Sequence, residues 1–147
     1  MPSGSATAMM RFAEVATGVL ATYLEECLRE LDMDDPEYEE KRNLIRANQV
    51  FPGVQIPRGG NELKFPSIVY GGVGEGTVDT YQSNFIATIS IRYDIRAKTM
   101  REVYELDSRL REALQATHRV SIDAGAIDLY DDEFSVHRRA RTVTMRI

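Results

Sequence analysis

The most regular pattern of apolar and polar positions lies in residues 85–95. Every second residue there is apolar, and all but one of the intervening residues are polar. An extended chain places alternate side chains on opposite faces, so this period of two predicts a strand with one buried face. The apolar positions are Phe85, Ala87, Ile89, Ile91, Tyr93 and Ile95.

Three other segments are expected to be strands, namely Phe65–Tyr70, Ile127–Phe134 and Arg139–Ile147. In the last of them, apolar residues again alternate with threonine and arginine. Residues 50–60 contain two prolines, which cannot donate to a strand ladder, and are expected to form an extended arm with turns.

A longer period predicts two main helices. Residues 6–31 carry apolar side chains every three or four positions, which predicts one long helix with a buried stripe. The stripe comprises Met9, Phe12, Ala16, Val19, Tyr23, Cys27 and Leu31. Cys27 is therefore expected to be a buried core thiol rather than a nucleophile. Residues 36–48 favour a short acidic helix that begins at Pro36.

The second main helix is expected to begin after Thr99. The sequence "TMRE" is a capping box, in which Thr99 accepts from the helix amides and Glu102 reaches back. Its apolar face comprises Val103, Leu106, Leu110, Ala113 and Leu114. Adjacent strand segments favour antiparallel pairing, so we expect a single α+β domain over residues 1–147. We expect a mainly antiparallel sheet of about four strands, with the N-terminal and central helices packed on one face.

Composition and charge narrow the possible functions. Of the 147 residues, 43% are apolar and 28% are charged, which is ordinary for a globular domain. No apolar run is long enough to span a bilayer, no secretory signal is expected, and the single cysteine fits a reducing compartment. Residues 25–40 hold nine acids against Arg29, a net charge of −8, whereas the last ten residues hold four arginines and no acid. Such asymmetry could steer self-association, or it could form two solvated faces.

The glycine-rich stretch "GGVGEG" at residues 71–76 follows an apolar run, as many phosphate-binding loops do. A phosphate loop must lead into a helix, but here β-prone residues and a strand follow, so no nucleotide or other cofactor is expected. We predict a mobile connection between strands that becomes ordered against a partner. Its expected contact residues are Val73, Glu75, Val78, Asp79 and Tyr81.

No catalytic residues and no metal ligands are expected. The acidic run at residues 128–133 lacks a histidine at ligand spacing and favours a turn or an edge strand. The C-terminal arginines lack interleaved aromatic residues, and the sequence pI is about 5.1, so an interface strand is favoured over a nucleic-acid site. Arg138, Arg139 and Arg141 are expected at a subunit boundary, paired with carboxylates of a neighbouring copy.

Four segments in order resemble a known family: "VFPGVQIP", "FPSIVYGGVGEG", the strand and capped helix of residues 84–114, and "SVHRRARTVTMRI". Together they are similar to the tail-terminator or tail-completion proteins of long-tailed bacteriophages, over roughly residues 45–147. The resemblance implies a non-enzymatic virion protein, assembled in the host cytoplasm, that forms a ring at the neck, usually of six subunits. Such a ring caps the tail tube, stops its polymerisation and docks the head connector, while viral DNA passes through its lumen without sequence-specific binding.

Two alternatives remain open. One is another neck adaptor or head-completion protein, which would also be a small ring-forming subunit. The other is a small ligand-binding or enzymatic α+β domain, which would require polar groups converging in a pocket.

Overall fold

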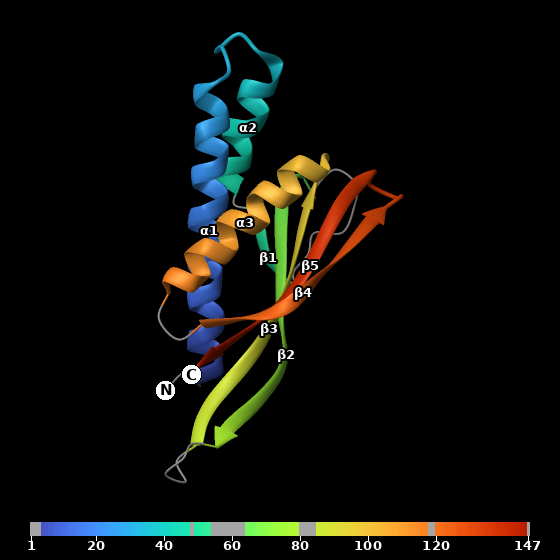
Figure 1. Ribbon diagram of the computed structural model, residues 1–147. Helices are drawn as coiled ribbons and strands as arrows, with labels where there is room; N and C mark the ends of the chain where they lie inside the picture. The colour runs from blue at the N-terminus through green and yellow to red at the C-terminus, as the bar shows by residue number, and fades with distance from the viewer. Residues whose placement is uncertain (1–3, 48, 54–63, 80–84, 118–119, 147) are drawn as a thin grey trace.

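The computed structural model shows helices packed on one face of a five-stranded sheet (Figure 1). It describes residues 4–47, 49–53, 64–79, 85–117 and 120–146. The elements are α1 (Gly4–Arg29), α2 (Pro36–Ala47), β1 (Val50–Pro52), β2 (Ser67–Asp79), β3 (Phe85–Ala97), α3 (Met100–Ala116), β4 (Val120–Asp131) and β5 (Val136–Arg146). The predicted α+β class, the N-terminal helix and the central helix are confirmed.

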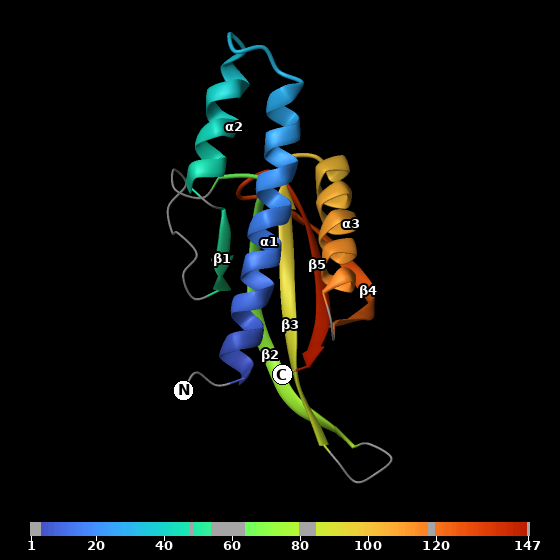
Figure 2. The same ribbon diagram turned by 90° about the vertical axis from the view of Figure 1, so that its left-hand side faces the viewer.

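The strand order is β1-β2-β3-β5-β4, and every neighbouring pair except β1 and β2 is antiparallel. The fifth strand, β1, has three residues and ends at Pro52, which removes a ladder donor. Figure 2 shows α1 and α3 side by side in front of the sheet, whereas α2 packs against α1. Within the described chain, no helix is long and apolar enough to cross a membrane.

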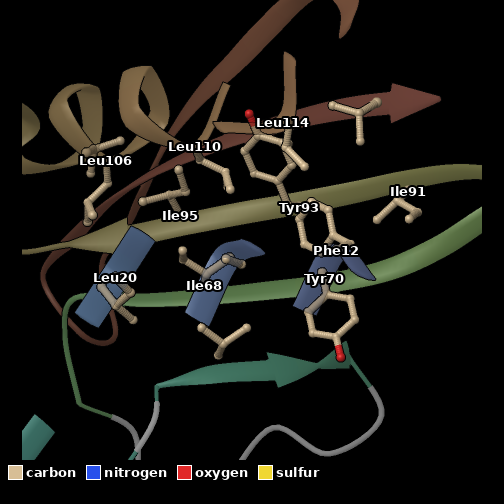
Figure 3. Packing of buried hydrophobic residues seen from close by; sticks show 14 of the residues in the cluster. Phe12, Leu20, Ile68, Tyr70, Ile91, Tyr93, Ile95, Leu106, Leu110 and Leu114 are labelled. Carbon is tan, nitrogen blue, oxygen red and sulfur yellow. The ribbon is translucent and has the colours of Figure 1, made fainter. Parts of the chain in front are cut away.

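The core lies between the helices and the predicted face of β3 (Figure 3). Phe12 of α1 contacts the rings of Tyr70 and Tyr93, with centroids 5.2 and 5.7 Å apart. From Ile89 to Ile95 the odd-numbered residues of β3 are at most 4% exposed, which confirms the predicted alternation there. The predicted N-cap at Thr99 is confirmed as far as its own side chain is concerned, because Thr99 Oγ1 accepts from Glu102 N at 3.2 Å.

In its second half the predicted stripe of α1 is only partly correct, because Val19 and Tyr23 are partly buried against the core but Leu31 lies beyond the end of the helix. Beyond Ala16 the buried residues are Leu20 and Leu24, whereas Cys27 is only half-buried and lies outside the core. A spacing of four rotates the buried face by about 40° per step. This rotation turns the later part of α1 away from the sheet and toward Leu44 of α2.

The predicted glycine-rich connection is also wrong, because β2 continues as a strand through Gly71, Gly72, Gly74 and Gly76 to Asp79. Antiparallel pairing with β3 extends along it, with a register shift between Gly72 and Gly74. The long regular β3 offers a complete ladder, and ladder hydrogen bonds outweigh the weak strand preference of glycine. The β2–β3 hairpin extends beyond the N-terminal end of α1 (Figures 1 and 2).

Candidate functional site

Arg138, Arg139 and Arg141 all lie on β5, which is an interior strand between β3 and β4. The interface strand expected here is therefore not an edge of the sheet. The acidic partners are Asp94 on β3, Asp128 on β4 and Asp107 on α3. Each of the three arginines therefore pairs with a carboxylate of its own chain. A role for them at a subunit boundary stays a prediction.

Asp107 of α3 is the centre of this ion-pair cluster. Asp107 is 1% exposed, and its carboxylate accepts from the Tyr93 hydroxyl at 2.7 Å. It also accepts from Arg139 Nε at 2.9 Å and from Arg141 Nε at 3.2 Å. Arg111 of α3 approaches the same carboxylate at 3.5 Å. One buried carboxylate thus ties α3 to both β3 and β5.

The sequence gives only a weak signal for this cluster. Asp107 and Arg111 are four residues apart, a spacing typical of exposed pairs on a helix. However, Asp107 lies between Leu106 and Leu110 on the helix face that meets the sheet, and Tyr93 shares the buried face of β3. An acid beside an apolar stripe, with arginines at alternate positions of a later strand, is the pattern that could have indicated it.

The surroundings of Asp107 favour its charged form. Burial opposes ionisation, but hydrogen bonds from Arg141 and Tyr93 and the charges of Arg141 and Arg139 outweigh it, so the pKa of Asp107 is lowered. Burial, followed by the nearby Asp107 charge, raises the pKa of the Tyr93 hydroxyl. Because an ionised carboxylate only accepts hydrogen bonds, Asp107 can hold the donors from Tyr93, Arg139 and Arg141 together at neutral pH.

Arg139 extends the cluster toward β4. Its guanidinium donates to Asp128 Oδ1 at 3.1 Å and lies 4.5 Å from the centre of the Tyr104 ring. The Tyr104 hydroxyl donates to Asp128 Oδ2 at 2.9 Å, and this hydrogen bond is the main reason that the pKa of Tyr104 is raised. These contacts join α3, β5 and the edge strand β4.

Arg138 lies on the opposite face of the sheet and pairs with Asp94 of β3, which is 8% exposed. The hydrogen bond to Asp94 raises the pKa of Arg138 despite its partial burial. Arg96 approaches the same carboxylate at 3.8 Å. Reversing the charge of the three β5 arginines would therefore place acids against Asp94, Asp107 and Asp128. Such a variant tests folding as well as assembly.

The other predicted contact residues lie elsewhere. Val73, Glu75, Val78 and Asp79 belong to β2, and Tyr81 lies outside the described residues. The register places Asp79 opposite Phe85, whereas Arg138 is opposite Arg96 near the other end of β3. The two groups of predicted contact residues are therefore not brought together.

The strand predicted at Ile127–Phe134 has different bounds, because β4 begins at Val120 and ends at Asp131. The acidic run at residues 128–133 therefore begins on the edge strand and continues into a turn. Asp131 Oδ1 accepts from the amides of Glu133 and Phe134 at 3.0 and 3.4 Å, which orders the turn between β4 and β5. In the described parts of the chain, no three histidine, cysteine or acidic side chains are placed to share a metal ion.

Several surfaces are open to partners. β4 forms one edge of the sheet, and at the other edge β1 pairs with β2 only up to Tyr70. The outer side of β2 from Gly71 to Asp79 thus has no strand partner among the described residues. No described helix packs on the face of the sheet that carries Arg138.

A broad groove of about 530 Å³ lies between α1 and α3. Its floor is mainly apolar and includes Val15, Val19 and Ala113. Arg109 lines the groove, and both Glu26 and Glu105 engage its guanidinium.

Comparison of the chain with protein-family models and with curated proteins gives no match.

The corrected position of Cys27 changes its expected reactivity. Its thiol is half-buried, so we expect a maleimide to label native protein measurably, although more slowly than protein unfolded in urea. Because this is the only cysteine, the labelled mass reports it directly. Equal rates in native and unfolded protein would mean that α1 is not packed as described.

Proposed function

We propose that this protein is a structural virion component that forms a ring at the head–tail neck of a long-tailed bacteriophage. The observation that carries the proposal is the open sheet. Over the described residues, no helix packs on one face of this sheet and both of its edges have unpaired stretches. Exposed strand edges pair readily with other chains, and natural monomers usually blunt or cover them. The resemblance of residues 45–147 to tail-terminator proteins supplies the particular role.

The two edges of the sheet are different, since β4 forms one and β2 with the short β1 forms the other. Contacts between different surfaces of identical subunits are head-to-tail, and they close into a ring when the rotation per subunit divides a full turn. The ring would cap the tail tube, end its polymerisation and receive the head connector. Viral DNA would cross the lumen without sequence-specific contacts.

The test is the mass of the assembled protein, measured by sedimentation and native mass spectrometry. We expect a discrete closed oligomer, either alone at high concentration or on purified tail tubes. Tubes capped by it should stop growing when tube subunits are added. A protein that stays monomeric and ignores both tubes and head connectors would contradict the proposal.

A further inference from the structure

The face of the sheet on which no described helix packs carries a hollow beside the exposed Arg92. Tyr93 points toward the helices, so its neighbour Arg92 lies on the opposite face. The register places Thr142 opposite Arg92, and it aligns Ala140 with Ile127. These four uncovered-face residues line a hollow of about 460 Å³.

The hollow lies where β4 departs from regular pairing. The register with β5 shifts between Ile122 and Ala126, and Gly125 between them has a φ of 90°. Ala140, at 3% exposure, is buried beside the hollow, whereas Ile127 is 59% exposed. An apolar side chain of a partner would bury Ile127 further, which is favourable in proportion to the apolar area removed from water.

Arg92 gives the lining of the hollow an exposed positive charge. Arg138 and Arg96 share Asp94 on this face of the sheet. Arg92 is exposed, and over the described residues no carboxylate pairs with it. The hollow therefore fits an occupant that combines an apolar tip with adjacent carboxylates.

The turn between α1 and α2 has this composition. Met33 is 82% exposed and stands between Asp32 and Asp34, which are also exposed. The amide of Asp35 donates to the Asp32 carbonyl at 2.9 Å, which closes a turn with Met33 and Asp34 at its centre. A turn that is already ordered loses little conformational entropy when it docks.

The turn projects beyond the sheet at the end of the α1–α2 hairpin in both Figure 1 and Figure 2, away from the strands β3, β4 and β5 that line the hollow. Resting on the self-association proposed above, we infer that the Met33 turn of one copy docks in the hollow of the next, with Asp32 and Asp34 facing Arg92. The contact is head-to-tail and joins the acidic segment of one subunit to the uncovered sheet face of another.

The test uses two charge-reversal variants of the full chain, Arg92→Glu and the pair Asp32→Lys with Asp34→Lys. Each variant alone should weaken self-association at least about tenfold, because like charges then meet at the contact. An equimolar mixture should assemble again. In the mixture, the reversed turn of the Asp32→Lys, Asp34→Lys variant can dock in the reversed hollow of the Arg92→Glu variant. The native turn of the Arg92→Glu variant can dock in the native hollow of the other. Arg101→Glu, which reverses an exposed arginine on α3, should assemble as the wild type does.

A second pair of variants tests the apolar part of the contact. Met33→Ser should weaken association, whereas Met10→Ser, which changes a methionine 61% exposed on α1, should leave it unchanged. Circular dichroism should be native for all variants, since the altered side chains are exposed.

The outcomes separate the two proposals. A wild type that remains monomeric even on tail tubes would contradict both. A wild type that assembles, with association indifferent to Arg92→Glu, would overturn only the docking contact. Charge-reversed variants that stay monomeric when mixed would also overturn it. If Arg92→Glu prevents binding to tail tubes but not self-association, the hollow receives the tube protein instead of a second copy.

Discussion

Replacing Asp107 by alanine is expected to lower the free energy of unfolding by about 3–5 kcal/mol, as breaking a buried ion pair from one side usually does. The loss is large because the change leaves the guanidinium groups of Arg139 and Arg141 without their shared carboxylate. Arg141 is only 7% exposed, so water cannot replace the lost partner fully. The Tyr93 hydroxyl loses its acceptor as well.

Urea denaturation of the variant and of the wild type measures this effect. Glu112→Ala is the matched control, because Glu112 is an exposed acid on the same helix and its loss should change stability by no more than about 0.5 kcal/mol. If the two variants unfold at the same urea concentration, Asp107 does not hold α3 to the sheet as described.

The same carboxylate predicts an acid-side loss of stability. The pKa of Asp107 is lowered in the folded protein, so the unfolded chain binds its proton at higher pH. Its stabilisation is complete well above its ordinary pKa of 3.8, and it is lost as the pH falls through the lower folded value. In that range the stability of Asp107→Asn should depend less steeply on pH than that of the wild type. If the stability of the variant and that of the wild type fall in parallel with pH, groups other than Asp107 cause the loss of stability in acid.

Shortening the β2–β3 hairpin is expected to abolish assembly while preserving the fold. In the register Gly76 is opposite Thr88, so a two-residue Asn-Gly turn in place of residues 77–87 can join them. Every described core residue remains, including Ile89 and those after it on β3. The change removes the part of the hairpin that extends beyond the helices and shortens the unpaired edge of β2.

Thermal unfolding and circular dichroism should show that the shortened protein remains folded. Sedimentation and tube capping should show a loss of association well above tenfold, which corresponds to more than about 1.4 kcal/mol. A full-length variant with Arg101→Glu serves again as a folded control that should still assemble. Normal assembly and capping by the shortened protein would mean that the hairpin is only a connector.

Most local structure follows from short-range patterns in the sequence. The period of two in β3 and the cap at Thr99 each depend on residues within a few positions of one another, so both could be predicted. The same patterns predict the α+β class. They do not determine where a strand ends when a long neighbouring strand continues to pair with it. For this reason β2 extends through four glycines beside β3. They also miss the rotation of the buried face of α1, since this depends on α2.

The sequence by itself determined the helices, most of the strands, the buried face of β3 and the segregation of charge along the chain. Only the tertiary structure decided which charges meet. Asp107 and Arg141 are 34 residues apart, and Asp94 and Arg138 are 44 apart. Such pairs depend on strand order and register. A side chain on a strand can contact only those residues of the adjacent strands and of the covering helix that lie on the same face of the sheet. The same pairing gave Arg138, Arg139 and Arg141 carboxylate partners within their own chain, and it left Arg92 exposed beside the hollow.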